Sequence, residues 1–189
     1  MEYKTEEIIF NAIKNLERFC LNNNLEIPNI KLHRLEPIKY YGNMITIFGS
    51  YKHNNIYVDV DCIYNYCIKY KTSFSKYFTD TLFHEFGHFL HLNYKQFSEM
   101  DLIIEDRYNL FKELATADFN YTRNTNEYVH IYCNKDNKFR LQRMRTPFKL
   151  LIINDYVNHY ENFATEFTRS VFESSFYKPY FKKMGLNFG

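Results

Sequence analysis

The feature that most constrains this fold is a run of apolar residues at helical spacing, interrupted on one side by polar residues. Between about Ser75 and Asn93 the large apolar side chains recur with a helical period, which predicts an amphipathic helix packed into a core. Residues 84–88 of this helix read His-Glu-Phe-Gly-His. Because residues four apart share one helical face, His84 and His88 must project into the same space.

Two imidazoles one helical turn apart are suited to binding a single zinc ion, with Zn–N distances of ~2.0–2.1 Å. Glu85 is one residue further round the helix, where it can reach an activated water as general base without ligating the metal. Zinc lowers the pKa of such a water toward about 7, so a modest base suffices at neutral pH. We therefore expect one Zn²⁺ per chain, held by His84 and His88.

Two further residues of this helix are informative. A glycine inside a helix costs about 0.8–1 kcal/mol relative to alanine, so Gly87 predicts that another segment approaches closely. His91 shares the face of His84 but lies about 10.5 Å along the axis from it, at ~1.5 Å per residue. Three imidazoles spread over that length do not easily meet at one tetrahedral ion, so we expect His91 to be packed or to support the site.

A catalytic zinc ion needs a third protein ligand, and the later helical segment at about 156–174 offers two glutamates. Glu161 and Glu166 flank the buried face of this segment on opposite sides. Small residues, Ala164 among them, border Glu161 and would let the two helices approach closely, so we expect Glu161 to be the ligand. Four other side chains stay open as alternatives: Glu113, which lies 25 residues after His88, Glu166, His159 and Asp155.

Strand patterns come early in the chain and helical patterns come late, which predicts an α+β fold. The apolar periodicity predicts an N-terminal helix from Thr5 to about Asn22 and strands at 30–35, 44–48 and 56–60. Turn residues between Gly49 and Asn55 predict that the last two strands form a hairpin. Later elements are predicted as a helix at 75–93, a helix at 101–118, a strand at 127–133 and a helix at 156–174.

Composition narrows the function class. The 24 Lys and Arg residues against 22 Asp and Glu give a net charge of +2, so nucleic acid is an unlikely partner. No apolar run approaches the ~20 residues of a membrane span, so we expect no membrane partner. The first residues of the sequence do not have the pattern of a secretory signal, so we expect an intracellular, cytoplasmic location, with non-classical export left open. The four cysteines have no close pair and predict reduced thiols.

The combination of the His84–His88 motif with a later E-x-F-A-x-x-F (Glu161, Phe163, Ala164, Phe167) resembles the gluzincin zinc metallopeptidases. It is most similar to the anthrax lethal-factor-like group with the Pro-Pro endopeptidases, and more distantly to ImmA/IrrE-type peptidases. The resemblance covers roughly residues 44–172, including a hairpin at 47–58 where these proteins keep a substrate-binding edge strand. It implies a zincin-like domain with His84, His88 and Glu161 as ligands and Glu85 as general base.

The chain departs from that family in two places. Lethal-factor-like enzymes have a tyrosine that stabilises the transition state seven residues before the ligand glutamate, and here that position is Asn154. Tyr156 and Tyr160 are the nearby candidates for this catalytic role. The spacing of 73 residues from His88 to Glu161 implies an insertion at about 120–148.

We therefore expect one zincin-like metallopeptidase domain over 1–189, with an N-terminal helix and first strand (1–43), a catalytic region (44–172) and a C-terminal tail (173–189). The expected activity is zinc-dependent endopeptidase cleavage of a peptide or protein bound in extended form, added as a strand to a sheet edge at 56–60. Two alternatives stay open: a catalytically silent binding or regulatory module, and a zinc hydrolase of a non-peptide substrate. The sequence assigns no oligomeric state.

Overall fold

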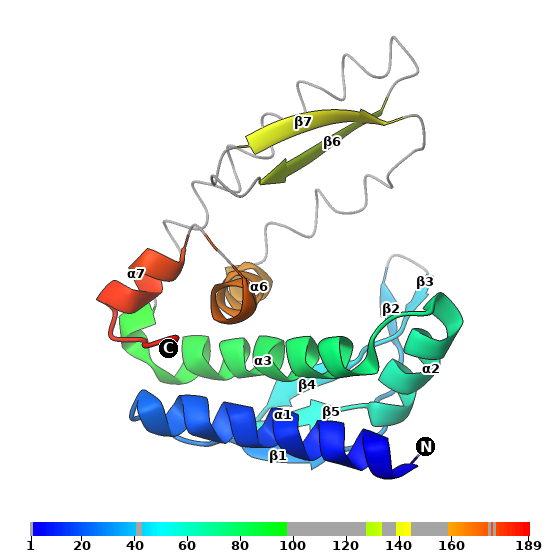
Figure 1. Ribbon diagram of the computed structural model, residues 1–189, viewed down its shortest axis with the longest axis horizontal. Coiled ribbons are helices and arrows are strands. Elements are labelled where there is room, and N and C mark those ends of the chain that lie inside the picture. Colours follow the sequence, from blue (N-terminus) through cyan, green and yellow to red (C-terminus); the bar gives the residue numbers. More distant parts are fainter. Residues whose placement is uncertain are drawn as a thin grey trace.

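The computed structural model describes residues 2–40, 43–97, 128–133, 139–144, 159–173, 175 and 177–189. It has the predicted α+β fold, with a small three-stranded sheet and several helices (Figure 1). The N-terminal part contains α1 (Glu2–Asn22), β1 (Asn29–Leu32), β2 (Ile38–Tyr40), β3 (Asn43–Ile45), β4 (Gly49–Lys52) and β5 (Asn55–Val58). The remaining elements are α2 (Val60–Tyr70), α3 (Phe74–Asn93), the 3₁₀ turn η1 (Lys95–Phe97), β6 (Tyr128–Cys133), β7 (Phe139–Met144), α6 (His159–Phe172) and α7 (Lys178–Lys183).

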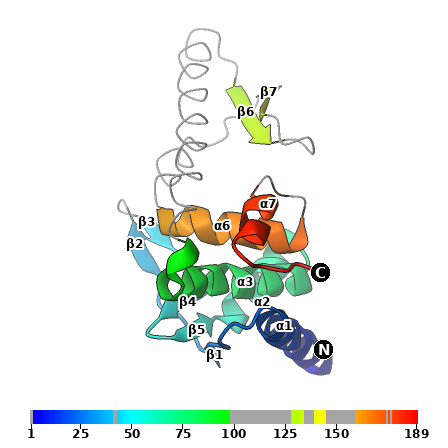
Figure 2. The ribbon, with the colours of Figure 1, turned by 90° about the vertical axis from the view of Figure 1, so that its left-hand side faces the viewer.

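Helix α3 is the central layer of the fold. Helix α1 and the three-stranded sheet cover one side of it, and α6 crosses the other side (Figures 1 and 2). The ring of Phe19 on α1 joins these layers, since it lies 6.0 Å from the Phe83 ring on α3 and 5.8 Å from the Phe167 ring on α6. The histidine motif therefore sits on a helix that is covered by other elements on two sides.

The three-stranded sheet has the order β1-β5-β4, with β1 parallel to β5 and β4 antiparallel to β5. Its hairpin differs from the prediction, because Gly49–Lys52 is a strand and only His53 and Asn54 form the turn. Both turn residues have positive φ, 49° and 62°, as a two-residue type I′ hairpin requires and as His and Asn tolerate. The predicted strand at 44–48 shortens to β3, which pairs with β2 instead.

Helix α2 is an element that the sequence patterns did not predict. Val60, expected at the end of a strand, begins the helix because Asp59 acts as its N-cap. The Asp59 carboxylate accepts hydrogen bonds from the backbone N–H of Cys62 at 2.9 Å and of Leu35 at 2.8 Å. An aspartate followed by apolar residues four apart, Ile63 and Cys67, was the available signal.

The other predicted elements agree with the structure where it describes them. The N-terminal helix begins at Glu2 rather than Thr5, and Ser73 caps the N-terminus of α3 by accepting from the Lys76 N–H. Strand β6 confirms the strand at 127–133, and it pairs with β7 in a separate antiparallel sheet. The predicted helix at 101–118 lies outside the described residues, as does the start of the predicted helix at 156–174.

Aromatic side chains dominate the core around α3. Cys20, Cys62 and Cys67 are free thiols, as predicted. Burial raises the pKa of the Cys20 thiol to about 12, so it behaves as a small apolar side chain. The largest fully buried side chains are Phe78, Phe83, Phe86, Phe89, Phe97, Phe163, Phe167, Phe181, Leu16, Ile56, Ile63 and Leu82.

Candidate metal centre

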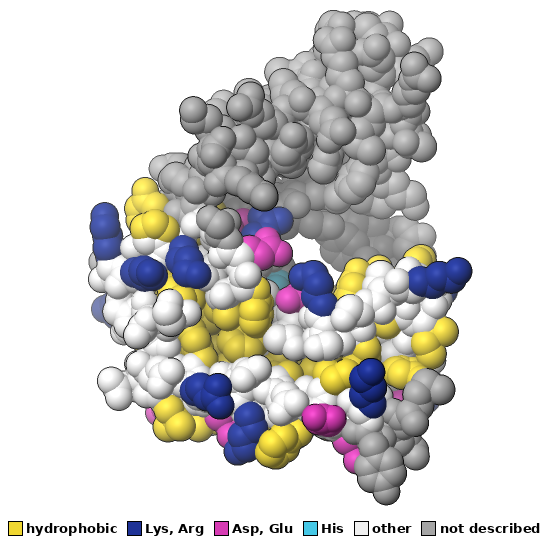
Figure 3. Space-filling model, viewed as in Figure 1, with side chains coloured by type: hydrophobic (Ala, Val, Ile, Leu, Met, Phe, Trp, Pro, Cys, Tyr) yellow, Lys and Arg dark blue, Asp and Glu magenta, His cyan; other side chains and the backbone are white. Residues whose placement is uncertain are grey.

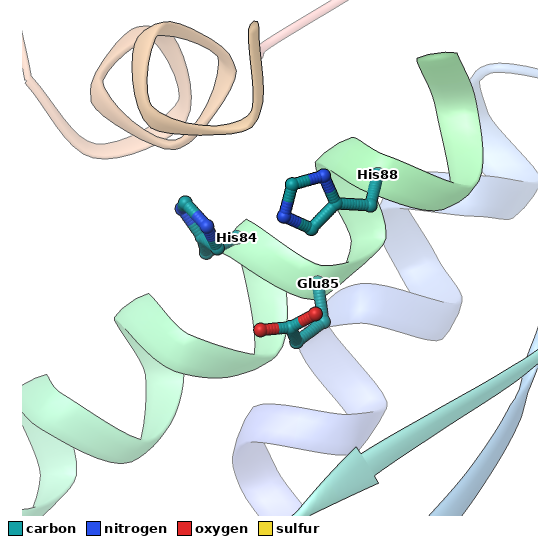
Figure 4. A group of neighbouring side chains, drawn as sticks. All are labelled: His84, Glu85 and His88. Carbon is teal, nitrogen blue, oxygen red and sulfur yellow. The ribbon is translucent and has the colours of Figure 1, made fainter. Parts of the chain in front are cut away.

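The two motif histidines lie side by side on α3 with their rings almost perpendicular (Figure 4). The ring centroids of His84 and His88 are 4.9 Å apart at an interplanar angle of 87°. Their candidate ligand nitrogens and a carboxylate oxygen of Glu85 all lie within 4.8 Å of one another. Both histidines are half-buried, whereas Glu85 is only 7% exposed. Among the described residues, the structure thus brings the three predicted α3 side chains together.

These side chains form the floor of a cleft of about 950 Å³. Strand β4 forms one wall and α6 the other, and histidine surface is visible between acidic and basic side chains in Figure 3. The cleft is lined from α3 by Asp80, Thr81, His84, Glu85, His88 and Leu92, from the strand side by Ile38, Thr46, Ile47, Phe48, Gly49, Ser50 and Tyr51, and from the α6 side by Thr165, Thr168, Arg169, Phe172 and Glu173.

The α6 wall approaches α3 at Gly87, as the sequence predicted. A Cβ added at Gly87 would lie 2.7 Å from the Cα of Ala164 and 3.0 Å from its Cβ. Only a residue without a side chain allows the two helix backbones to be this close. The ring centroid of Phe163 lies 4.6 Å from that of His91, so His91 packs against α6, which agrees with the packed alternative predicted for it.

The β4 wall approaches α3 at a second glycine. A Cβ added at Gly49 would lie 2.7 Å from the Cγ of Glu85, 2.8 Å from its Oε1 and 2.7 Å from the Cγ2 of Thr81. The strand backbone therefore lies directly against the carboxylate that we expect to act as base. Sequence analysis placed Gly49 in a turn and did not predict this contact.

Positions 161 and 166, the two glutamates of α6, lie on different faces of that helix. Glu166 is buried, ion-paired with Arg169 at 2.9 Å and hydrogen-bonded by the Ser175 hydroxyl at 3.3 Å, so its carboxylate is already engaged, and Glu166 does not line the cleft although Arg169 does. Thr165 and Thr168 line the cleft instead. Position 161 precedes them by four and seven residues, and it therefore belongs to the same face of α6.

Of the other residues predicted as metal ligands or catalytic groups, some lie on α6 and the rest lie outside the described residues. His159 and Tyr160 are in the first turn of α6, next to position 161. Glu113, Asp155 and Tyr156 lie outside the described residues. Sequence analysis missed Thr81 and Leu92 as cleft residues, although each is close in spacing to one histidine: Thr81 comes three residues before His84 and Leu92 comes four after His88.

The predicted substrate-binding edge at 56–60 is wrong, because β5 is the central strand and pairs on both sides. The edge strand next to the histidines is β4. The Asp59 N–H donates to the Phe48 carbonyl at 2.8 Å. In the alternating antiparallel pattern, the backbone N–H and C=O groups of residues 48, 50 and 52 therefore point toward β5. The N–H and C=O groups of Gly49 and Tyr51 consequently point to the other edge, where no strand pairs within the described ranges.

An exposed ion pair lies at the end of the cleft near the start of α3. The Lys76 ammonium donates to the Asp80 carboxylate at 2.8 Å, and this hydrogen bond raises the pKa of Lys76. Both side chains are well solvated, so the pair contributes little to stability.

Searches of protein-family models, of curated protein sequences and of solved structures found no match to this chain. In the part of the chain that the structure describes, no helix combines the length and the apolar character needed to cross a membrane.

Proposed function

We propose that this chain is a zinc-dependent endopeptidase with a zincin-like fold. The observation that supports it best is the position of the motif residues, with His84, Glu85 and His88 on the floor of a cleft between an edge strand and a second helix. A scattered pair of packed histidines would not need a buried glutamate beside them at the bottom of an open cleft. The sequence resemblance to gluzincins points to the same class.

The donor set fits zinc. His84 and His88 would hold the ion, because imidazole nitrogens are preferred zinc ligands and both rings open onto the cleft. Glu161 would be the third ligand, since position 161 is on the cleft face of α6 and its helix contacts α3 at Gly87. When bound, zinc would supply Lewis-acid activation of water and of the scissile carbonyl group.

Glu85 would act as general base and then as general acid. Its carboxylate would take a proton from the attacking water and deliver it to the leaving amine, so that no net proton is consumed at Glu85. Burial against Gly49 and Thr81 restricts the carboxylate to few orientations. The chain therefore holds its proton acceptor in place before substrate binds.

Strand β4 would bind the substrate backbone. The outward N–H and C=O groups of Gly49 and Tyr51 match an extended peptide that adds a fourth strand to the sheet. Such a peptide would lie in the cleft above His84 and His88, with its backbone held on one side by β4.

The test compares wild type with Glu85→Gln, and with Glu7→Gln on exposed α1 as a matched control. We expect one zinc per chain in all three proteins by metal analysis. In a peptide library, cleavage should fall about 10²–10⁴-fold in Glu85→Gln alone, the usual loss on removing a general base. If wild type binds zinc but cleaves nothing, the silent binding module is favoured. If it cleaves only non-peptide esters or amides, the zinc hydrolase of a non-peptide substrate is favoured. Absence of zinc would refute the proposal.

The third ligand is tested by three alanine variants. Glu161→Ala should lose zinc, whereas Glu113→Ala should keep it. Glu166→Ala should also keep zinc but lower the free energy of unfolding, because Arg169 and Ser175 would lose their buried partner. Zinc retained by Glu161→Ala and lost by Glu113→Ala would reverse our assignment.

A further inference from the structure

Three exposed large apolar side chains line the cleft and take no part in the chemistry proposed above: Ile38 on β2, Leu92 on α3 and Phe172 on α6. Leu92 on α3 is 56% exposed and Phe172 at the end of α6 is 45% exposed, and both line the cleft. Single exposed apolar residues are ordinary on protein surfaces. Leu92, one helical turn after His88, and Phe172, which contacts Phe83 next to His84, lie on either side of the histidine pair, and we take this as a sign that a ligand covers both.

The separation of Leu92 and Phe172 can be estimated along α3. The Phe172 ring lies 4.9 Å from the Phe83 ring, so Phe172 is close to the turn of α3 that contains Phe83. From Phe83 to Leu92 the helix advances about 13.5 Å at ~1.5 Å per residue. An extended peptide covers that distance in about four residues at ~3.3 Å each, and residues four apart in a strand point to the same side.

We infer that the cleft recognises an extended peptide with two bulky apolar side chains, at positions i and i+4, one against Phe172 and the other against Leu92. The outward backbone groups of β4 would hold the peptide between them. The bond to be cleaved then lies between the two apolar residues, over His84 and His88. This inference rests on the proposed function for cleavage, but the recognition of the peptide can be tested without turnover.

The probes are fluorescein-labelled decapeptides of alanine, serine and lysine that carry two leucines spaced by three, four or five residues. Binding is measured by fluorescence anisotropy on zinc-supplied Glu85→Gln protein, so that cleavage does not interfere. We expect the peptide with a spacing of four to bind about tenfold more tightly than the others. Leu92→Ser and Phe172→Ser should each remove that advantage, and Leu21→Ser, at a 68% exposed position on α1, should not.

Equal affinity for all three spacings, or an advantage that survives in both cleft variants, would overturn the inference. Circular dichroism of each variant verifies that the fold is kept, and Leu92 and Phe172 provide two independent substitutions. If wild type cleaves peptides without regard to spacing, the inference fails and the endopeptidase proposal stands. If the spaced peptide binds preferentially but is never cleaved, the inference holds and the endopeptidase proposal fails.

Discussion

The two walls of the cleft both meet α3 at a glycine, but the contacts differ in kind. At Gly87 the neighbouring atoms belong to Ala164, beginning with its Cα at 2.7 Å, so helix backbone faces helix backbone. At Gly49 the neighbouring atoms belong to the side chains of Glu85 and Thr81. A backbone can yield only if the whole helix moves, whereas a side chain can rotate. We conclude that Gly87 decides whether the α6 wall can form, while Gly49 decides where the base lies.

The largest effect should come from Gly87→Ala. The new methyl group would push α6 away from α3, and overpacking of this kind costs about 1–3 kcal/mol. Because the contact is with helix backbone, we expect the upper end of that range, and the preference of about 0.8–1 kcal/mol for alanine over glycine in a helix then leaves a net loss near 2 kcal/mol in urea unfolding. Ser75→Ala, at an exposed position of the same helix, is the control and should change stability little.

The Cys20 thiol provides a second measurement of the same variant. Because burial raises its pKa to about 12, almost no thiolate is present in the folded protein at pH 8, and alkylation requires opening of the structure. Peptide mapping after iodoacetamide treatment should show Cys20 reacting about 30-fold faster in Gly87→Ala, the factor that corresponds to ~2 kcal/mol. An unchanged rate would mean that the α3–α6 contact is not part of the cooperative fold.

Gly49→Ala should have a smaller effect on stability and a selective effect on activity. The buried Glu85 side chain would have to turn and Thr81 would have to shift, so we expect the free energy of unfolding to fall by about 1 kcal/mol, at the lower end of the cost of overpacking. A displaced base is poorly aligned, and we expect peptide cleavage to fall about tenfold or more with zinc binding unchanged. Lys52→Ala, at the exposed end of β4, is the matched control. A larger loss of stability than in Gly87→Ala would reverse the ranking of the two walls.

Double-mutant cycles measure how strongly each glycine is coupled to its neighbour, with a resolution of about a few tenths of a kcal/mol. In a Glu85→Ala background, Gly49→Ala should destabilise less, by about 0.5 kcal/mol, because the Cγ and Oε1 atoms are gone and only Thr81 remains in contact. In an Ala164→Gly background, Gly87→Ala should cost nearly as much as before, because the Cα at 2.7 Å is still present. Equal coupling in both cycles would contradict the distinction between backbone and side-chain contact.

The smallest effect should come from the charges at the end of the cleft. Lys76→Met removes the exposed ion pair with Asp80, and such pairs contribute about 0.3–0.5 kcal/mol. Because the folded state raises the pKa of Lys76, this contribution is fully present below the ordinary lysine pKa and is lost as the pH rises through the raised folded-state pKa. Urea unfolding should therefore show a larger difference between the variant and wild type at pH 7 than at pH 11.

Local sequence patterns were sufficient to predict some helices and strands and insufficient to predict others. The apolar period at 75–93 predicted α3 almost to its ends, and Gly87 predicted the close contact that Ala164 makes. The hairpin was predicted with the wrong turn, because the left-handed conformations of His53 and Asn54 are stabilised by strand pairing that the residues themselves do not reveal. Helix α2 was missed because its N-cap, Asp59, also ends a strand.

By itself, the sequence determined that His84 and His88 share one face of a helix with Glu85 beside them, because helical hydrogen bonding has a fixed local period. Tertiary structure decided which strand became the edge beside them, since β5 is covered by β1, a strand from about 25 residues earlier in the chain, whereas β4 pairs only with β5 within the described residues. It also decided how deeply Glu85 is buried. That depth depends on Gly49 and its strand lying against α3, a contact between segments about 35 residues apart that no local period can encode.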